Sequence, residues 1–259
     1  MGVTIGQWVI LAVGALLVGV TKTSIGGLGT FVVMLFAFVF PAKESTASTL
    51  FLLLAGDVLA VSLYHSQADW KLIRGLLPAV LPGIALGALF MHYVDDKVML
   101  IGIGLCIAAT LIVQAFLRLR ARKTSQPADG DNANEAAPNR ALIVGTGVMA
   151  GFVTLVGNAA AAVMSLYLLV THTDKTRFVA SSAWFYLIIN VVKVPFIVSL
   201  GIVNWRHVAI LGTVVPLVVV AGLLGKRFLT RLNQHQFELI TLLVTIAACV
   251  VLLVRGIMA

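Results

Sequence analysis

The sequence predicts an all-α polytopic membrane protein built from two inverted-topology repeats of about five apolar segments each. Three observations support this fold class. The chain is 60% hydrophobic and 11% charged, with a mean hydropathy of +1.06, whereas a soluble domain carries about 25% charged residues. Apolar runs near the ~20 residues that span a bilayer recur along the chain. The two halves of the chain also repeat similar residues at a nearly constant spacing.

Ten apolar segments are visible, separated by short polar breaks. They are approximately 5–21, 25–40, 45–64, 72–92, 97–117, 141–156, 159–171, 177–200, 207–225 and 236–254. The first has no Lys or Arg before it, so we expect it to belong to the fold rather than to a signal peptide. The polar stretch 118–140 cannot bury apolar surface and is predicted to be a disordered linker. It divides the chain into membrane repeats 1–117 and 141–259.

Corresponding residues of the two halves lie 132 to 135 positions apart. The pairs are Gly19 with Gly151, Lys43 with Lys175, Asp57 with Asn190, Trp70 with Trp205, and Gly87 with Gly222. Because each half has an odd number of segments, the second half is expected to enter the membrane from the opposite side.

The distribution of basic residues tests this inversion independently, since cytoplasmic loops are enriched in Lys and Arg. If successive loops alternate sides, one side collects Lys71, Arg74, Arg118, Arg120, Arg122, Lys123, Arg140, Lys175, Arg177, Lys226, Arg227 and Arg231. The other side collects Lys43, Lys97, Arg206 and Arg255. Lys22 and Lys193 complete the 18. The linker is therefore predicted to be cytoplasmic, with both termini outside and the protein integral to the cytoplasmic (inner) membrane.

A reporter fused within residues 125–139 is therefore expected to be cytoplasmic, and one fused after Ala259 external. Alkaline phosphatase and fluorescent-protein fusions measure the two locations. A linker and a C-terminus found on the same side would contradict the inverted repeat.

The first two segments of each half are short, and polar or glycine-rich breaks join them. One break runs from Lys22 to Gly29 and the other from Val156 to Ala159. In transporters built from inverted repeats, such interrupted segments face each other at the bilayer midplane. A helix beginning near Gly26 or Asn158 would offer backbone N–H groups to an anion. The pattern leaves open whether these segments are re-entrant hairpins or thin crossings.

Three ionisable residues, Lys22, Asp57 and Lys193, fall at membrane depth. Charges at the bilayer centre cost roughly 2.5–3.5 kcal/mol on insertion scales and mark pathways by default. Two lysines and one aspartate leave an excess positive charge, which an anionic substrate would neutralise. Alternatively, the lysines snorkel to the interface, Asp57 is a structural partner of either lysine, and Asn158 and Asn190 join helices by hydrogen bonds.

Several runs of the sequence resemble the sulfite exporter TauE/SafE family. They are Lys22-x-x-x-Gly26-Gly27, Pro41-Ala42-Lys43-Glu44, the segment with Asp57, Asp69-Trp70, Asp174-Lys175, Ser181, Asn190-x-x-Lys193 and Pro195. The resemblance covers essentially the whole chain outside the linker. It implies a membrane transporter of sulfite, organosulfonates or related oxyanions. The sequence departs from the family pattern twice, with Ser24 in place of Gly and Gly157-Asn158-Ala159-Ala160-Ala161-Ala162 in place of a His-Ala-Gly-Gly-Pro-Pro-like turn. These departures suggest a less sharply broken second hairpin and a different anion.

We therefore predict a secondary transporter for a small sulfur oxyanion, with export as the expected direction. Lys22 and Lys193 would attract the anion, and Asn190 would orient it. Asp57 would balance the lysines or carry a coupling proton. The hydrogen-bond donors are predicted to be Ser24, Asn158 and backbone N–H groups near Gly26, Gly27 and Ala159. No cofactor or metal is predicted, because the histidines lack metal-ligand spacing.

Other function classes fit the sequence less well. The net charge of +8 is scattered over loops rather than gathered on a soluble domain, which argues against nucleic-acid binding. No G-x-x-x-x-G-K-[ST] motif is present for ATP-driven pumping. An intramembrane enzyme would need a nucleophile with a base or a metal cluster at depth. A membrane scaffold or sensor explains the helices but not three buried charges. The expected partners are the anion, the bilayer and, as an open option, a second copy in a homodimer.

Overall fold

The fold is described from a computed structural model of the chain. It describes residues 3–24, 29–95, 97–98, 101, 105, 140–158, 175–233, 236, 239, 243, 250 and 254. Across those residues every regular element is helical, in agreement with the predicted class. The predicted linker and the segments 97–117, 159–171 and 236–254 lie wholly or largely outside the described residues.

Eight α-helices and one 3₁₀ turn are described. They are α1 (Ile5–Thr23), α2 (Gly29–Phe36), α3 (Ala42–Tyr64), η1 (His65–Gln67), α4 (Trp70–Tyr93), α6 (Arg140–Gly157), α8 (Lys175–Ser199), α9 (Trp205–Thr213) and α10 (Val215–Arg231). Helices α1, α3 and α8 are long and apolar enough to cross a membrane. Helix α2 has eight residues and so covers only about 12 Å, well short of the ~30 Å hydrocarbon layer.

The ninth apolar segment is broken, where the sequence analysis expects one continuous segment over 207–225. Helices α9 and α10 meet at Val214 and differ in direction by 51°. Pro216 lies in the first turn of α10. Its ring removes an N–H donor and clashes with the preceding turn, so a straight helix cannot continue through it.

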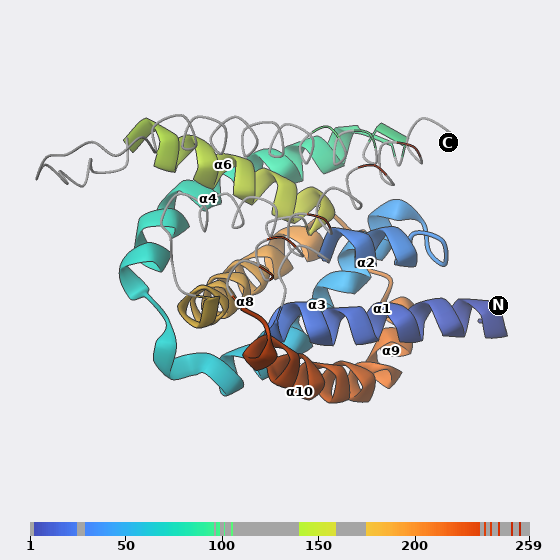
Figure 1. The fold of residues 1–259 in the computed structure, drawn as a ribbon. Helices are drawn as coiled ribbons and strands as arrows, with labels where there is room; N and C mark the ends of the chain where they lie inside the picture. Colours follow the sequence, from blue (N-terminus) through green and yellow to red (C-terminus); the bar gives the residue numbers. More distant parts are fainter. Residues whose placement is uncertain are drawn as a thin grey trace, which may run out of the picture.

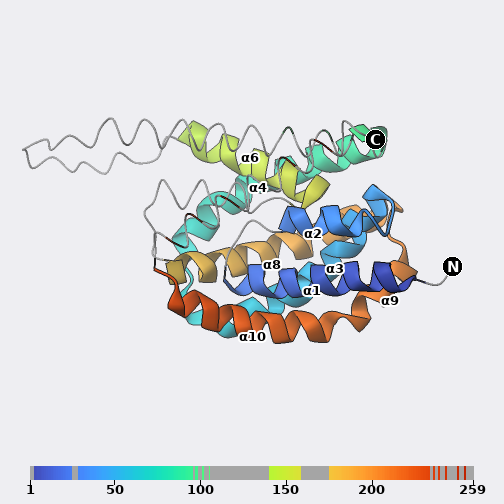
Figure 2. The ribbon, with the colours of Figure 1, turned by 45° about the vertical axis from the view of Figure 1, so that its right-hand side comes forward.

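The helices form three layers, with α3 and α8 packed together in the middle (Figures 1 and 2). Helices α1 and α10 cover one side of this central pair, and α4 and α6 cover the other. The outer pairs join different halves of the chain. Helix α1 of the first half packs on α10 of the second, and α6 of the second half packs on α4 of the first.

Glycines permit the close approach in both outer pairs. A Cβ atom at Gly19 of α1 would meet the Val218 carbonyl oxygen and the Gly222 nitrogen of α10. A Cβ atom at Gly151 of α6 would meet the Val80 carbonyl oxygen of α4. Small residues at such crossings let two backbones approach and are typical of helix packing in membranes.

Gly19→Ala is expected to destabilise the protein, because the added methyl group would press on backbone atoms of α10 that cannot rotate away. Overpacking of this kind costs roughly 1–3 kcal/mol. Gly212→Ala in α9 is the matched control, since open space surrounds a Cβ atom there. Both changes add helix propensity, so the difference isolates the crowding. Melting temperatures in detergent measure it, and equal values would contradict the close contact.

Candidate anion-binding site

Polar and charged side chains gather where α3, α8 and the C-terminal end of α1 meet. Asp57 of α3 is fully buried, and Asn190 and Lys193 of α8 are 4% and 1% exposed. The side chain of Lys22, in the last turn of α1, is 11% exposed. The structure thus brings together four of the predicted site residues. Both lysine side chains have polar partners inside the helix bundle.

Lys22 and Asp57 form an ion pair. The Lys22 Nζ lies 2.6 Å from the Asp57 Oδ1 and 4.7 Å from the centroid of the Tyr186 ring, as in a cation–π contact. Gly56 makes room for this approach, because a Cβ atom there would lie 3.0 Å from the Lys22 Cγ. Of the two lysines that could pair with Asp57, Lys22 is its direct partner in the structure.

Lys193 is held entirely by acceptors of the protein. Its Nζ donates to the Thr154 carbonyl oxygen at 2.7 Å, to the Asn158 Oδ1 at 2.5 Å and to the Asn190 Oδ1 at 3.1 Å. These three bonds use all three donors of an ammonium group. The ammonium also lies at the C-terminal end of α6, where a helix favours positive charge.

Asn190 connects the two lysines. Its Nδ2 donates to the Asp57 Oδ2 at 2.6 Å, while its Oδ1 accepts from Lys193. The order Lys22, Asp57, Asn190, Lys193 therefore forms one continuous polar chain across the interface of the two halves. Asp57 and Asn190, which the sequence pairs at corresponding positions of the halves, contact each other directly.

Asn158 directly follows the last residue of α6, and the segment after it, where the sequence predicts a helix N-terminus, lies outside the described residues. The Asn158 φ of 51° is left-handed, a conformation that asparagine tolerates better than most residues. Its Nδ2 donates to the Thr46 carbonyl oxygen of α3 at 3.2 Å. Asn158 thus fixes the end of α6 to α3 and, through its Oδ1, to Lys193.

Of the predicted hydrogen-bond donors not yet described, only Ser24 lies within the described residues. The Ser24 hydroxyl donates to the Val20 carbonyl oxygen at 2.6 Å and so caps α1. Gly26, Gly27 and Ala159 lie outside the described residues.

Two residues of this cluster, Thr154 and Tyr186, are not among the site residues predicted from the sequence. Each carries a signal that helical spacing or the repeat would have revealed. Tyr186 lies four residues before Asn190 and shares its helix face. Thr154 lies 132 positions after Lys22 and so corresponds to it in the second half.

Counted as ionised groups, the two lysines and the one aspartate of the cluster carry a formal charge of +1. Lys193 has no donor left for a ligand without giving up a bond to the protein. Lys22 is partly exposed, and its one ionic partner among the described residues is the Asp57 carboxylate. Lys22 is thus the more accessible of the two lysines. The part of the chain that the structure describes holds no group of three His, Cys, Asp or Glu side chains suited to a metal ion.

Comparison with known proteins agrees with this chemistry. A family model described as Sulfite exporter TauE/SafE matches residues 11–252, which is nearly the whole chain. No curated protein and no solved structure matches the chain.

Proposed function

The chain belongs to the sulfite exporter TauE/SafE family, and from this premise we propose that it is a secondary transporter of a small sulfur oxyanion. Sulfite or an organosulfonate is the proposed substrate, and export across the cytoplasmic membrane is the proposed direction. The observation that carries the proposal is the buried chain from Lys22 to Lys193 with its excess positive charge.

The anion would bind by taking the place of the Asp57 carboxylate at Lys22. Both are compact anions with oxygen acceptors, so the Lys22 ammonium can exchange one for the other without losing its charge partner. Lys193 would hold the positive end of the polar chain and, with Asn190, orient the site. Ser24, Asn158 and the backbone N–H groups near Gly26, Gly27 and Ala159 would supply further donors to the oxygens.

An anion at Lys22 leaves Asp57 without its cation, and a proton would compensate for it. Asp57 therefore acts either as a carrier of a coupling proton or as a counter-ion that moves aside. In the second case an outward electrical force drives export, since a membrane potential contributes about 2.3 kcal/mol per charge per 100 mV.

We also propose the inverted arrangement of the halves 1–117 and 141–259 with a cytoplasmic linker 118–140. The reciprocal packing of α1 on α10 and of α6 on α4 supports it. The placement of basic residues at opposite ends of α3 also supports the inverted arrangement. Lys226 contacts the C-terminal end of α3 through the Leu63 carbonyl oxygen and the Tyr64 ring, whereas Lys43 lies at the opposite end of that helix.

Sulfite counterflow in proteoliposomes tests the proposed function. Lys22→Gln is expected to lower the rate by more than tenfold, equivalent to about 1.4 kcal/mol, because the exchangeable cation is lost. Lys97→Gln, an exposed lysine beyond α4, is the matched control and should retain the rate. Equal losses in the two variants would contradict the role of the buried cation.

A scaffold or sensor is the competing function. Neither would carry sulfite flux in the unsubstituted form, and a scaffold would also show no stabilisation by sulfite in a thermal-shift assay, which detects binding to the native state.

A further inference from the structure

Two cavities lie at opposite ends of the molecule and are built from corresponding parts of the two halves. The first, of about 770 Å³, lies between the loop before α4 and the start of α8. The second, of about 500 Å³, lies between the start of α3 and the loop before α9. Asp69 and Trp70 of the first cavity correspond to Asn204 and Trp205 of the second, 135 positions later.

The charges of the two cavities differ. Lys71, Arg177 and Asp69 line the first, and Lys43 and Glu44 line the second. Among the described lining residues, the formal charges therefore sum to +1 in the first cavity and to zero in the second.

Three pairs of corresponding positions differ in charge, namely Asp69 and Asn204, Thr176 and Glu44, and Arg177 and Ser45. Thr176 of the first cavity lies 132 positions after Glu44 of the second, so a hydroxyl group replaces a carboxylate. In the second cavity the Glu44 Oε2 accepts from the Asn204 Nδ2 at 2.9 Å and lies 3.0 Å from the His207 Nδ1.

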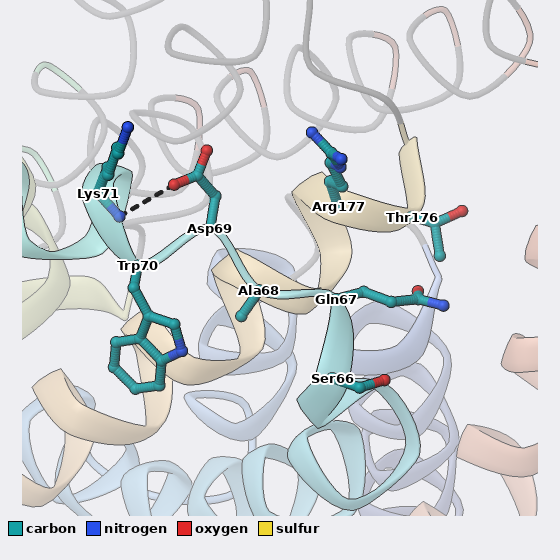
Figure 3. A pocket seen from close by; sticks show the side chains of 8 residues that line it. All are labelled: Ser66, Gln67, Ala68, Asp69, Trp70, Lys71, Thr176 and Arg177. Carbon is teal, nitrogen blue, oxygen red and sulfur yellow. Dashed lines mark hydrogen bonds between the residues drawn. The ribbon is translucent and has the colours of Figure 1, made fainter.

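The arrangement of the first cavity favours an anion despite its aspartate. The Asp69 Oδ1 accepts from the Lys71 backbone N–H at 2.9 Å and caps the start of α4. Figure 3 shows Lys71 and Arg177 on either side of Asp69, with all three side chains extending in the same direction. Trp70 extends the other way and packs on Trp184, with ring centroids 5.3 Å apart.

We propose that this first cavity is a docking site that collects the sulfur oxyanion from one side of the membrane, and that its counterpart at the other end is not. The inference rests on the proposed transport function. A cleft with net positive charge raises the local concentration of an anion and speeds its association. Helix α8 then leads inward, since Arg177 lies 13 residues, or about 20 Å, before Asn190.

The test measures sulfite transport kinetics from each face of oriented vesicles at low ionic strength. The double variant Lys71→Gln, Arg177→Gln is expected to raise KM five- to tenfold from the face that the first cavity opens to. The kcat should stay within twofold, and KM from the opposite face should not change. High salt should remove most of the difference, because it screens exposed charges. Lys43→Gln in the second cavity is the matched control and should leave KM unchanged at the first face.

A second variant changes the charge of the first cavity while it keeps both Lys71 and Arg177. Thr176→Glu places in the first cavity the carboxylate that Glu44 supplies in the second, and it is expected to raise KM at the same face. Size-exclusion profiles in detergent establish that each variant is folded.

Several outcomes would overturn the docking site. They are an unchanged KM in both variants, an equal rise from both faces, and a loss confined to kcat. Vesicles of phosphatidylcholine alone should preserve the effect. An effect that requires added phosphatidylglycerol would identify a lipid headgroup as the occupant instead. Absence of sulfite flux through the unsubstituted protein gives a separate result that would reject both the transport function and this inference.

Discussion

Lys193→Met is expected to abolish sulfite transport and to destabilise the protein by about 3 kcal/mol or more. Methionine fills a similar volume, but it leaves three buried acceptors without their donor. These are the Thr154 carbonyl oxygen, the Asn158 Oδ1 and the Asn190 Oδ1. Unpaired buried acceptors cost about 1–3 kcal/mol each.

The measurements are the melting temperature in detergent and sulfite counterflow in proteoliposomes. Lys97→Met, which removes an exposed ammonium, is the control and should change neither. If Lys193→Met loses transport but keeps its melting temperature, Lys193 contacts the anion and does not hold α6 and α8 together.

Asp57→Asn is expected to retain sulfite exchange but to lose all response to an imposed pH gradient. The amide of Asn keeps an oxygen for Lys22 in a side chain of almost the same shape, but its NH₂ group replaces the oxygen that accepts from Asn190, so that one hydrogen bond is lost. The amide cannot gain or lose a proton in the physiological range, so a coupling proton would have no carrier.

Transport into proteoliposomes with and without a pH gradient measures this response. Asp95→Asn is a suitable control, since the Asp95 carboxylate is exposed and accepts only a local backbone N–H from Val98. Full gradient-driven transport in Asp57→Asn would assign Asp57 to the role of counter-ion for Lys22 alone.

The sequence predicts the helical class and identifies the charged members of the site. This succeeds because an ionisable residue inside an apolar segment is rare and costly, so Lys22, Asp57 and Lys193 stand out individually. It does not predict which lysine pairs with Asp57. That choice depends on how α1 and α3 are aligned, and Gly56 of α3 permits their close approach at Lys22.

Two further features escape sequence reasoning for different reasons. The Lys193 ammonium bonds to the backbone carbonyl oxygen of Thr154; the repeat marks the position of Thr154, but every residue type supplies a carbonyl group, so the side chain does not indicate this bond. Pro216 marks the break between α9 and α10 in the sequence. An assignment of segments from apolar length alone does not take a single proline into account.

The reciprocal packing of the halves has a consequence for how the protein is made. Thr23 near the end of α1 reaches the Gly222 carbonyl oxygen of α10 across 199 positions of sequence. At about 5–20 residues per second, roughly 10 to 40 seconds of synthesis separate the two helices. During that interval the glycine face of α1 has no partner from α10 and must be covered by lipid or by the insertion machinery. Helix α6 is synthesised after α4, so its partner α4 is already in the membrane when α6 is inserted.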